Sequence, residues 1–412
     1  MSPALARGLL AAPDDPLPAI DDRVIAAARR GAWFAFNLSG GKDSTASAHA
    51  AIALLDALGH PRDRRIAIHA DLGRAEWRST PAMVAAIADR LGKPLLVVSR
   101  SAGDMVSRWE QRFLSGKRRY EALETYNLIG PWSSASLRFC TSELKVQVIG
   151  PELARRYRGE TVVSVIGLRR DESPSRRSTP VSRVDERFAK PGNAASTCML
   201  SWHPAVDWSA DDVFGIHARH GLPLHEAYVR YRTTRLSCAF CVLASAHDLV
   251  ASTEAPGNLH LYRHLVAIEA ASTFSFQPQR WLADVAPRLL PAALLRDIGR
   301  AKLRAHERRT LEAEMPPELR FVKGWPPRMP SLAEAALIAK ARAPSSPIMA
   351  SPTIFPTLPR SRRGSRTCSP RRPNGPASEP EGRTSLEGAS GEFRPRVSLL
   401  PNAQPLSPQS KE

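Results

Sequence analysis

Short apolar runs alternate with amphipathic helical patterns between residues 20 and 250. The apolar runs predict buried strands at residues 33–38, 65–70, 94–98 and 161–167. Between them, residues 44–58 place Ala48, Ile52 and Leu55 on one helical face, and residues 81–91 form a second helical pattern. Because such alternation is typical of βαβ units, the sequence predicts an α/β fold with an open, mainly parallel sheet and helices on both faces.

The pattern changes twice towards the C-terminus. Helical periodicity continues over residues 251–343, and from Pro344 the chain is rich in proline, serine and arginine with almost no periodic apolar pattern. We therefore predict an N-terminal extension at 1–24, an α/β domain at 25–250, a helical extension at 251–343 and a disordered tail at 344–412 that is dispensable for activity. No apolar stretch approaches the roughly 20 residues that span a bilayer, so we expect neither a membrane span nor a signal peptide.

The charge balance of the chain is strongly basic. It carries 58 Lys and Arg against 40 Asp and Glu, a formal net charge of +18. This excess favours polyanionic partners such as nucleotides, RNA or DNA. Residues 259–340 could form a nucleic-acid-binding face or a solvated helical surface, and the sequence does not decide between them. Five cysteines are too few for a disulfide scaffold, which indicates a reducing compartment and a cytoplasmic location.

The turn after the first predicted strand has the chemistry of an anion site. Two glycines let the backbone approach a phosphate, the start of the following helix offers free N–H groups, and a lysine adds charge. The glycine spacing fits neither a Walker A loop nor a dinucleotide-binding fingerprint. A tight turn that merely uses glycine is the alternative, but strand, turn and helix all favour the anion site. The loop consists of Ser39, Gly40, Gly41, Lys42, Asp43 and Ser44.

Residues after two further strands are predicted to reach the same edge of the sheet. In open α/β sheets, ligands bind beyond the carboxyl ends of the strands. Asp71 follows the second strand, where a carboxylate suits a ribose hydroxyl or a magnesium ion. Arg169 and Arg176 follow the fourth strand, and on a helix they would share a face that could hold phosphates. Ser209 and Asp212 fit a helix N-cap and its partner, so we assign them a structural role.

Together these motifs resemble a known family. The Ser-Gly-Gly-Lys-Asp-Ser loop is similar to the PP-loop of ATP pyrophosphatases. Residues 69–73, 167–176 and 204–208 are similar to further motifs of the phosphoadenosine phosphosulfate (PAPS) reductase family, and the resemblance covers roughly residues 30–245. It implies a Rossmann-like fold of the PP-loop (HUP) type that binds ATP and Mg²⁺. Besides the loop and Asp71, the nucleotide-binding residues that it implies are Gly167, Arg169, Glu172 and Arg176.

The resemblance also indicates a reaction. It is nearer to the DNA phosphorothioation sulfurtransferases and the sulfate adenylyltransferase small subunits than to true reductases. Family members that cleave ATP keep the full Lys-Asp loop, whereas reductases need a mobile cysteine near the C-terminus, and after Cys241 this chain has only Cys368. The resemblance therefore implies that the chain cleaves ATP to AMP and pyrophosphate to adenylylate a substrate. The catalytic residues that it implies are Lys42, Asp43, Asp71 and Arg169.

The acceptor is less well defined by the sequence. The basic charge fits sulfur transfer to RNA or DNA, with a cysteine desulfurase or another protein as the sulfur donor. The first alternative is a sulfonucleotide reductase or a sulfate adenylyltransferase subunit in sulfur assimilation. An alternative of another class is a non-catalytic nucleotide- or nucleic-acid-binding protein.

The cysteines form a second group of candidate site residues. Cys238 and Cys241 are a C-x-x-C pair, a turn that brings two thiolates together, with a redox dithiol or two small buried residues as alternatives. Cys140 lies in an Arg-x-Cys-Thr-x-x-Leu-Lys segment. Both motifs resemble those that ligate a 4Fe–4S cluster in iron–sulfur members of the family, which implies a cluster, with zinc as the alternative. Cys198 decides between a closed four-cysteine cluster and a three-cysteine cluster with one open iron.

Overall fold

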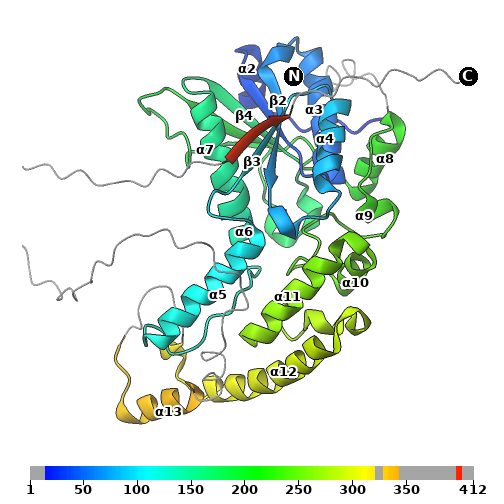
Figure 1. The fold of residues 1–412 in the computed structure, drawn as a ribbon. Helices are drawn as coiled ribbons and strands as arrows, with labels where there is room; N and C mark the ends of the chain where they lie inside the picture. The colour runs from blue at the N-terminus through cyan, green and yellow to red at the C-terminus, as the bar shows by residue number, and fades with distance from the viewer. Residues whose placement is uncertain (1–13, 321–327, 343–395, 401–412) are drawn as a thin grey trace, which may run out of the picture.

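The computed structural model describes residues 14–320, 328–342 and 396–400, the last five by their backbone alone. Within these residues, an open sheet of seven strands has the order β5-β6-β4-β1-β2-β3-β7 (Figure 1). The five inner strands are parallel, and β5 and β7 are antiparallel edge strands. The predicted α/β fold is confirmed. The strands are β1 Trp33–Asn37, β2 Arg65–Asp71, β3 Leu95–Ser99, β4 Thr161–Ile166, β5 Ser182–Val184, β6 Cys198–Trp202 and β7 Arg396–Leu400.

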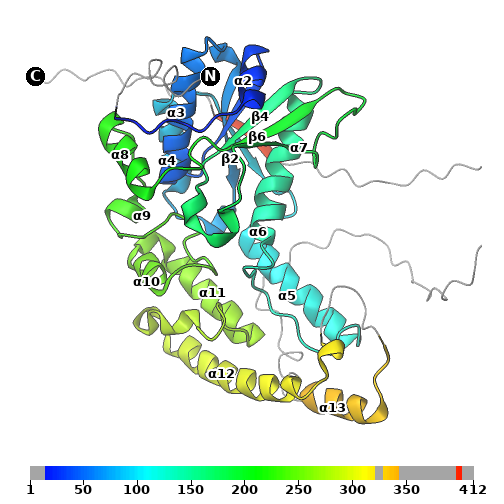
Figure 2. The ribbon, with the colours of Figure 1, turned by 180° about the vertical axis from the view of Figure 1, so that it is seen from behind.

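Helices cover both faces of the sheet (Figures 1 and 2). On one face, apolar side chains of α2, α3 and α4 pack against Phe34 and Phe36 of β1. On the other face, Val148 and Leu153 of α7 pack against Ile68 of β2. The two helices predicted from the sequence correspond to α3 and α4. The bounds of these helices are α2 Asp22–Arg29, α3 Lys42–Ala57, α4 Thr80–Arg90 and α7 Gln147–Arg156.

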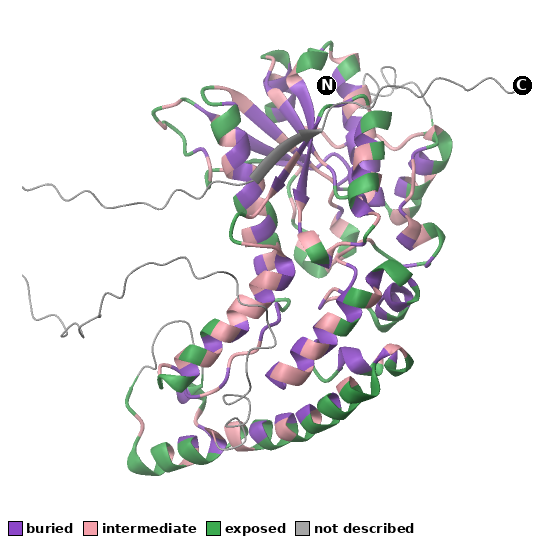
Figure 3. Cartoon of the chain, viewed as in Figure 1, coloured by how far each residue is buried: buried purple, intermediate pink, exposed green. Residues whose placement is uncertain are grey.

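A helical region lies beyond the carboxyl edge of the sheet (Figure 1). Its core joins Trp109 on α5 and Trp132 to Tyr262 and Phe276, so it crosses the predicted domain boundary at residue 250. Figure 3 shows that α12 is exposed along its outer side. The longer helices here are α5 Met105–Glu121, α10 Ala246–Glu254, α11 Leu259–Ser272, α12 Ala292–Ala313 and α13 Leu332–Arg342.

Shorter elements surround the carboxyl edge of the sheet. Helix α8 starts with a capping box in which Ser209 and Asp212 bond each other's backbone N–H groups, which confirms the structural role predicted for both residues. These elements are α6 Phe139–Thr141, α8 Ala210–His220, α9 Glu226–Val229 and the 3₁₀ turns η2 Gly73–Ala75, η4 Arg170–Glu172 and η5 Pro174–Arg176.

Strand β7 corrects the predicted tail in one place. It pairs with the whole of β3, from Leu95 opposite Leu400 to Ser99 opposite Arg396. The prediction of disorder is therefore wrong for these five residues, while 343–395 and 401–412 lie outside the described residues. The segment reads Arg-Val-Ser-Leu-Leu, and its β-branched and apolar residues suit a short strand that covers the open edge of β3. The strand was not predicted from the sequence because its few apolar residues are surrounded by prolines and serines.

No helix in the described part of the chain is both long enough and apolar enough to cross a bilayer.

Candidate functional site

A cavity of about 920 Å³ opens at the carboxyl edge of the sheet. From β1 the chain passes to β2 and β3 on one side, whereas β4 lies on the other side of β1. The strand order therefore reverses between β1 and β4, and open α/β sheets bind ligands at such a point. The cavity is lined there by Ser39, Ser44, Gly167 and Arg176. The structure thus brings together two of the segments predicted from the sequence.

The predicted phosphate loop joins β1 to α3. Gly40 has a φ of +75°, which favours glycine, and Gly41 is the N-cap of α3. Ser44 Oγ donates to the carbonyl oxygen of Gly41 at 2.9 Å and accepts from the N–H of Ser39 at 3.2 Å, which fixes the turn. In this described segment, the N-terminus of α3 has no side-chain cap. The positive end of the dipole of this 16-residue helix therefore lies beside the cavity, where it can bind an anion.

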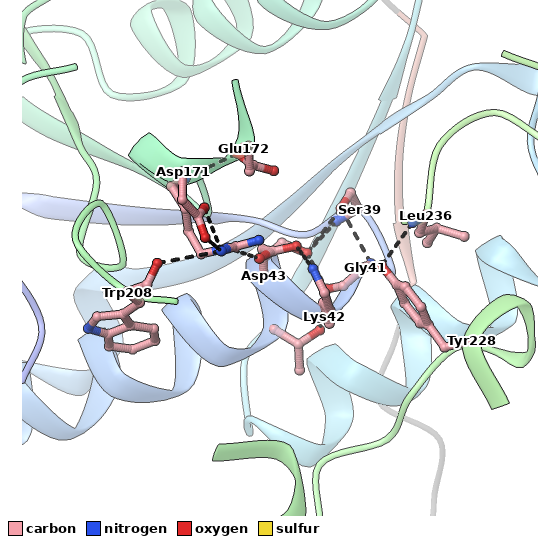
Figure 4. Close-up of polar contacts among 12 residues, drawn as sticks. Ser39, Gly41, Lys42, Asp43, Asp171, Glu172, Trp208, Tyr228 and Leu236 are labelled. Atoms are coloured by element: carbon pink, nitrogen blue, oxygen red, sulfur yellow. Dashed lines mark hydrogen bonds and ion pairs between the residues drawn. The ribbon is translucent and has the colours of Figure 1, made fainter. Parts of the chain in front are cut away.

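Lys42, Asp43 and Arg169 form a chain of ion pairs at this loop. Figure 4 shows the pair of Lys42 and Asp43. Lys42 Nζ lies 2.7 Å from Asp43 Oδ2, and Arg169 Nε lies 2.6 Å from Asp43 Oδ1. Burial alone would raise the pKa of Asp43, but Lys42 and Arg169 outweigh it and hold the pKa below its ordinary value. Arg169 also pairs with Asp171. Three of the residues predicted to be catalytic are thus in direct contact.

Lys42 is buried at the start of α3. The residue is only 4% exposed, and its ammonium lies 5.6 Å from the ring centre of Phe214 and 5.9 Å from that of Tyr228. Tyr228 accepts a hydrogen bond from the N–H of Leu236, and burial raises the pKa of Tyr228 to about 12, so its phenol is neutral. The loop lines the cavity through Ser39 and Ser44, while the ammonium of Lys42 is held by Asp43 and two aromatic rings.

Gly167 packs directly against the phosphate loop. A Cβ at this position would lie 2.6 Å from the carbonyl oxygen of Asp43 and 2.6 Å from both the nitrogen and the Cα of Ser44. Real side chains do not approach backbone so closely, so only glycine fits here without displacing the loop. The structure therefore gives Gly167 a packing role that holds the loop against the end of β4.

We expect Gly167→Ala to destabilise the protein by about 1–3 kcal/mol, because the extra methyl group overpacks the contact, and to weaken ATP binding. Gly299→Ala is the matched control, since nothing lies within 4 Å of that position on α12. The control should be neutral or stabilising by up to about 1 kcal/mol, because alanine is the better helix former. Urea unfolding and calorimetric titration with ATP measure the two effects. Equal stability and affinity in both variants would contradict the assignment.

The prediction that Arg169 and Arg176 share a helical face is wrong. The segment after β4 forms two short turns, η4 and η5, because Pro174 lacks an N–H and cannot continue a helix. Arg169 precedes η4 and is buried, whereas Arg176 ends η5 and lines the cavity. Glu172 pairs with Arg176 and accepts from the N–H of Arg169 at 3.1 Å. Glu172 thus holds both arginines.

Asp71 ends β2, as predicted, and stabilises the next turn. Its Oδ1 accepts the N–H of Gly73 at 2.7 Å, at the start of η2. Ala70 and Leu72 line the cavity on either side of it. A role of Asp71 in binding ribose or magnesium remains a proposal.

Three of the four candidate metal ligands converge. Burial raises the pKa of the Cys238 thiol, and the nearby Cys241 and Cys140 raise it further. All three thiols pack against one core cluster, and Cys238 also lines the cavity. Across the described ranges, however, no group of three or more His, Cys, Asp or Glu side chains is positioned to hold a metal ion. Whether these thiols hold a 4Fe–4S cluster or zinc stays a prediction.

Cys198 lies apart from these three cysteines. It begins β6 and pairs in register with Thr161, the first residue of the parallel strand β4. It is therefore at the amino edge of the sheet, roughly 15 Å from the carboxyl edge for a five-residue strand. Its side chain packs against a different core cluster. Of the two alternatives left open for Cys198, strand direction contradicts the closed four-cysteine site, because it places this cysteine at the opposite edge.

Comparisons with known proteins agree with the resemblance seen in the motifs. The model of the phosphoadenosine phosphosulfate reductase domain matches residues 34–243. An uncharacterized 37.8 kDa protein of Escherichia phage 186 is 28% identical over 124 residues, which cover 29% of this chain and 34% of the phage protein. The chain thus spans about a third of that relative's length.

One solved structure is similar at a low level. It is the phosphate complex of phosphoadenylyl-sulfate reductase from Candida auris, which is 12% identical. The alignment covers 54% of this chain and 98% of that chain with a TM-score of 0.31, a likeness too weak to support an argument.

Proposed function

This chain belongs to the phosphoadenosine phosphosulfate reductase family, and from that premise we propose that it cleaves ATP to AMP and pyrophosphate and adenylylates an acceptor. The observation that carries the proposal is the uncapped N-terminus of α3, with its Lys-Asp pair, at the point where the strand order reverses. The acceptor that we propose is RNA or DNA destined for sulfur transfer. The net charge of +18 supports a polyanionic acceptor.

The loop supplies binding and charge stabilisation in this proposal. N–H groups at the start of α3 bind phosphate oxygens, and the hydroxyls of Ser39 and Ser44 add donors. Arg176, which also lines the cavity, balances the charge that develops on the leaving pyrophosphate. Lys42 acts through the loop, since its charge is paired with Asp43.

Two cofactors belong to the proposal. No group of acidic side chains in the described chain forms a cage for a divalent ion, so Mg²⁺ would arrive on the nucleotide phosphates. Cys140, Cys238 and Cys241 would hold a 4Fe–4S cluster, which supplies redox or sulfur-binding chemistry when bound. Because Cys238 lines the cavity, that chemistry would face the nucleotide.

The test is an assay of the purified full-length chain with ATP and Mg²⁺. Release of pyrophosphate and AMP in equal amounts is the expected result. A second candidate, sulfonucleotide reduction, is favoured by the position of Cys238 in the cavity wall. Release of sulfite from PAPS with a dithiol reductant, without pyrophosphate release from ATP, would replace the proposal by this second candidate.

A further inference from the structure

His203 lies in the cavity wall immediately after β6. The residue is 5% exposed, and it lines the same cavity as Ser39 and Ser44 of the phosphate loop. The backbone N–H of His203 donates to the carbonyl oxygen of Val181 at 2.8 Å, so the backbone at this point is fixed. The functional site described above gives this imidazole no role.

The hydrogen bonds of His203 determine which ring nitrogen is free. Nδ1 lies 2.9 Å from the carbonyl oxygen of Pro180. A carbonyl only accepts, so Nδ1 carries a proton and donates it, and in the neutral ring Nε2 holds a lone pair. Among the residues that the structure describes, Nε2 has no hydrogen-bond partner. The free lone pair therefore belongs to Nε2.

The surroundings keep this ring neutral. Burial lowers the pKa of His203 below its ordinary 6.5 and outweighs the bond to Pro180, which raises it. The facing charges are cationic and lower the pKa further, and they come from β5, η4 and η5: Arg183, Arg170 and Arg176. Near pH 7 the ring is thus an unprotonated base beside guanidinium groups that attract an anionic substrate.

Strand order places His203 close to the phosphate loop. The loop follows β1 and His203 follows β6, with β4 between these two parallel strands. Two strand spacings separate them, about 10 Å. Both line one cavity, so a nucleotide held by the loop would share that cavity with the imidazole.

The second imidazole of the cavity wall, His69, has different electrostatic surroundings. Nδ1 of His69 lies 2.8 Å from the carbonyl oxygen of Leu38, and Nε2 lies 3.4 Å from Glu76 Oε2. Burial lowers the pKa of His69, but Glu76 outweighs it and the net shift is upward. Of the two rings, His203 is the one whose surroundings favour the neutral form.

We propose that Nε2 of His203 is the general base of the adenylyl transfer, and that the acceptor attacks through an atom that carries a proton. This inference rests on the proposed cleavage of ATP. Nε2 takes the proton of the attacking O–H group as the bond from that oxygen to the α-phosphorus forms. The bond from the α-phosphorus to the bridging oxygen breaks, and pyrophosphate leaves with the electron pair. The acceptor is thus a hydroxyl group, and water serves as the slow substitute.

The experiment uses water as the acceptor and measures pyrophosphate release from ATP and Mg²⁺ between pH 5 and 8. General-base catalysis contributes about 10²–10⁴-fold, so His203→Ala should release pyrophosphate at least about 10²-fold more slowly. Added imidazole should restore part of the rate in this variant. The wild-type rate should rise with pH through a pKa below 6.5, because the base must be unprotonated, and this rise should be absent in His203→Gln. His306→Gln, exposed on α12, is the control and should keep the wild-type profile.

The outcomes separate the base from the reaction itself. Normal release by His203→Ala, or a loss that imidazole does not restore, would overturn the assignment of His203 and leave ATP cleavage in place. If His203→Ala loses activity because it unfolds, its melting temperature will be lower than that of the wild type. The pH profile of pyrophosphate release by His203→Gln then provides the test. If the wild-type protein releases no pyrophosphate at any pH, both proposals are wrong.

Discussion

Lys42→Met is expected to slow pyrophosphate release from ATP by about 10²–10³-fold, the usual effect of removing one preorganised charge-stabilising group. The methionine retains the apolar contacts beneath Phe214 and Tyr228, but Asp43 loses the ammonium at 2.7 Å. The loop then lacks the charge that positions its first turn. Steady-state pyrophosphate release measures the loss.

The control for this variant is Lys302→Met on α12. That lysine pairs with Asp284 at the surface, far along the chain from the loop, and its removal should leave the rate unchanged. Equal rates for Lys42→Met and wild type would contradict a catalytic role for the loop lysine. Asp43→Ala is expected to destabilise the protein as well, because its removal leaves Lys42 and Arg169 without their shared partner, at a cost of about 3–5 kcal/mol.

Serine substitution of Cys140, Cys238 or Cys241 is expected to abolish iron binding in protein purified without oxygen. The three thiols pack together, and a cluster held by thiolates loses stability when one ligand is replaced. Iron and sulfide analysis, with absorbance in the visible range, measures the effect. The expected wild-type content is about four irons per chain, as for any 4Fe–4S cluster.

Cys198→Ser is the matched control, because this cysteine lies at the opposite edge of the sheet. It should retain full iron content. Loss of iron in Cys198→Ser would show that Cys198 belongs to the ligand set. A wild-type protein without iron that still cleaves ATP would refute the cluster and leave Cys238 and Cys241 as a dithiol or as core residues.

Much of the sheet was predictable because its inner strands are continuous apolar runs. β1, β2, β3 and β4 were recognised for this reason, as was the loop after β1, whose glycines and lysine are adjacent in the sequence. β5 has only three residues, β6 is an inner strand whose apolar run is interrupted by Ser201, and β7 is surrounded by proline and serine. Local patterns of this kind carry too little signal to define a strand.

The site was predictable in its residues but not in its contacts. The motifs identified Asp43 and Arg169, yet nothing local indicates that residues 126 positions apart share an ion pair. The prediction that Arg169 and Arg176 share a helical face was wrong because Pro174 interrupts the segment. Cysteine spacing likewise says nothing about strand direction, which separates Cys198 from the other thiols. These contacts are set by tertiary structure.

The central claim is that ATP is cleaved between its α- and β-phosphates, at the bond from the α-phosphorus to the bridging oxygen. Two ATP analogues test it most directly, one with a methylene group between the α- and β-phosphorus and one with it between the β- and γ-phosphorus. With Mg²⁺ and the full-length protein, the account predicts that the β,γ-methylene analogue yields AMP and methylenediphosphonate, while the α,β-methylene analogue stays intact. Release of phosphate from the α,β-methylene analogue, with no AMP from the other, would contradict the account.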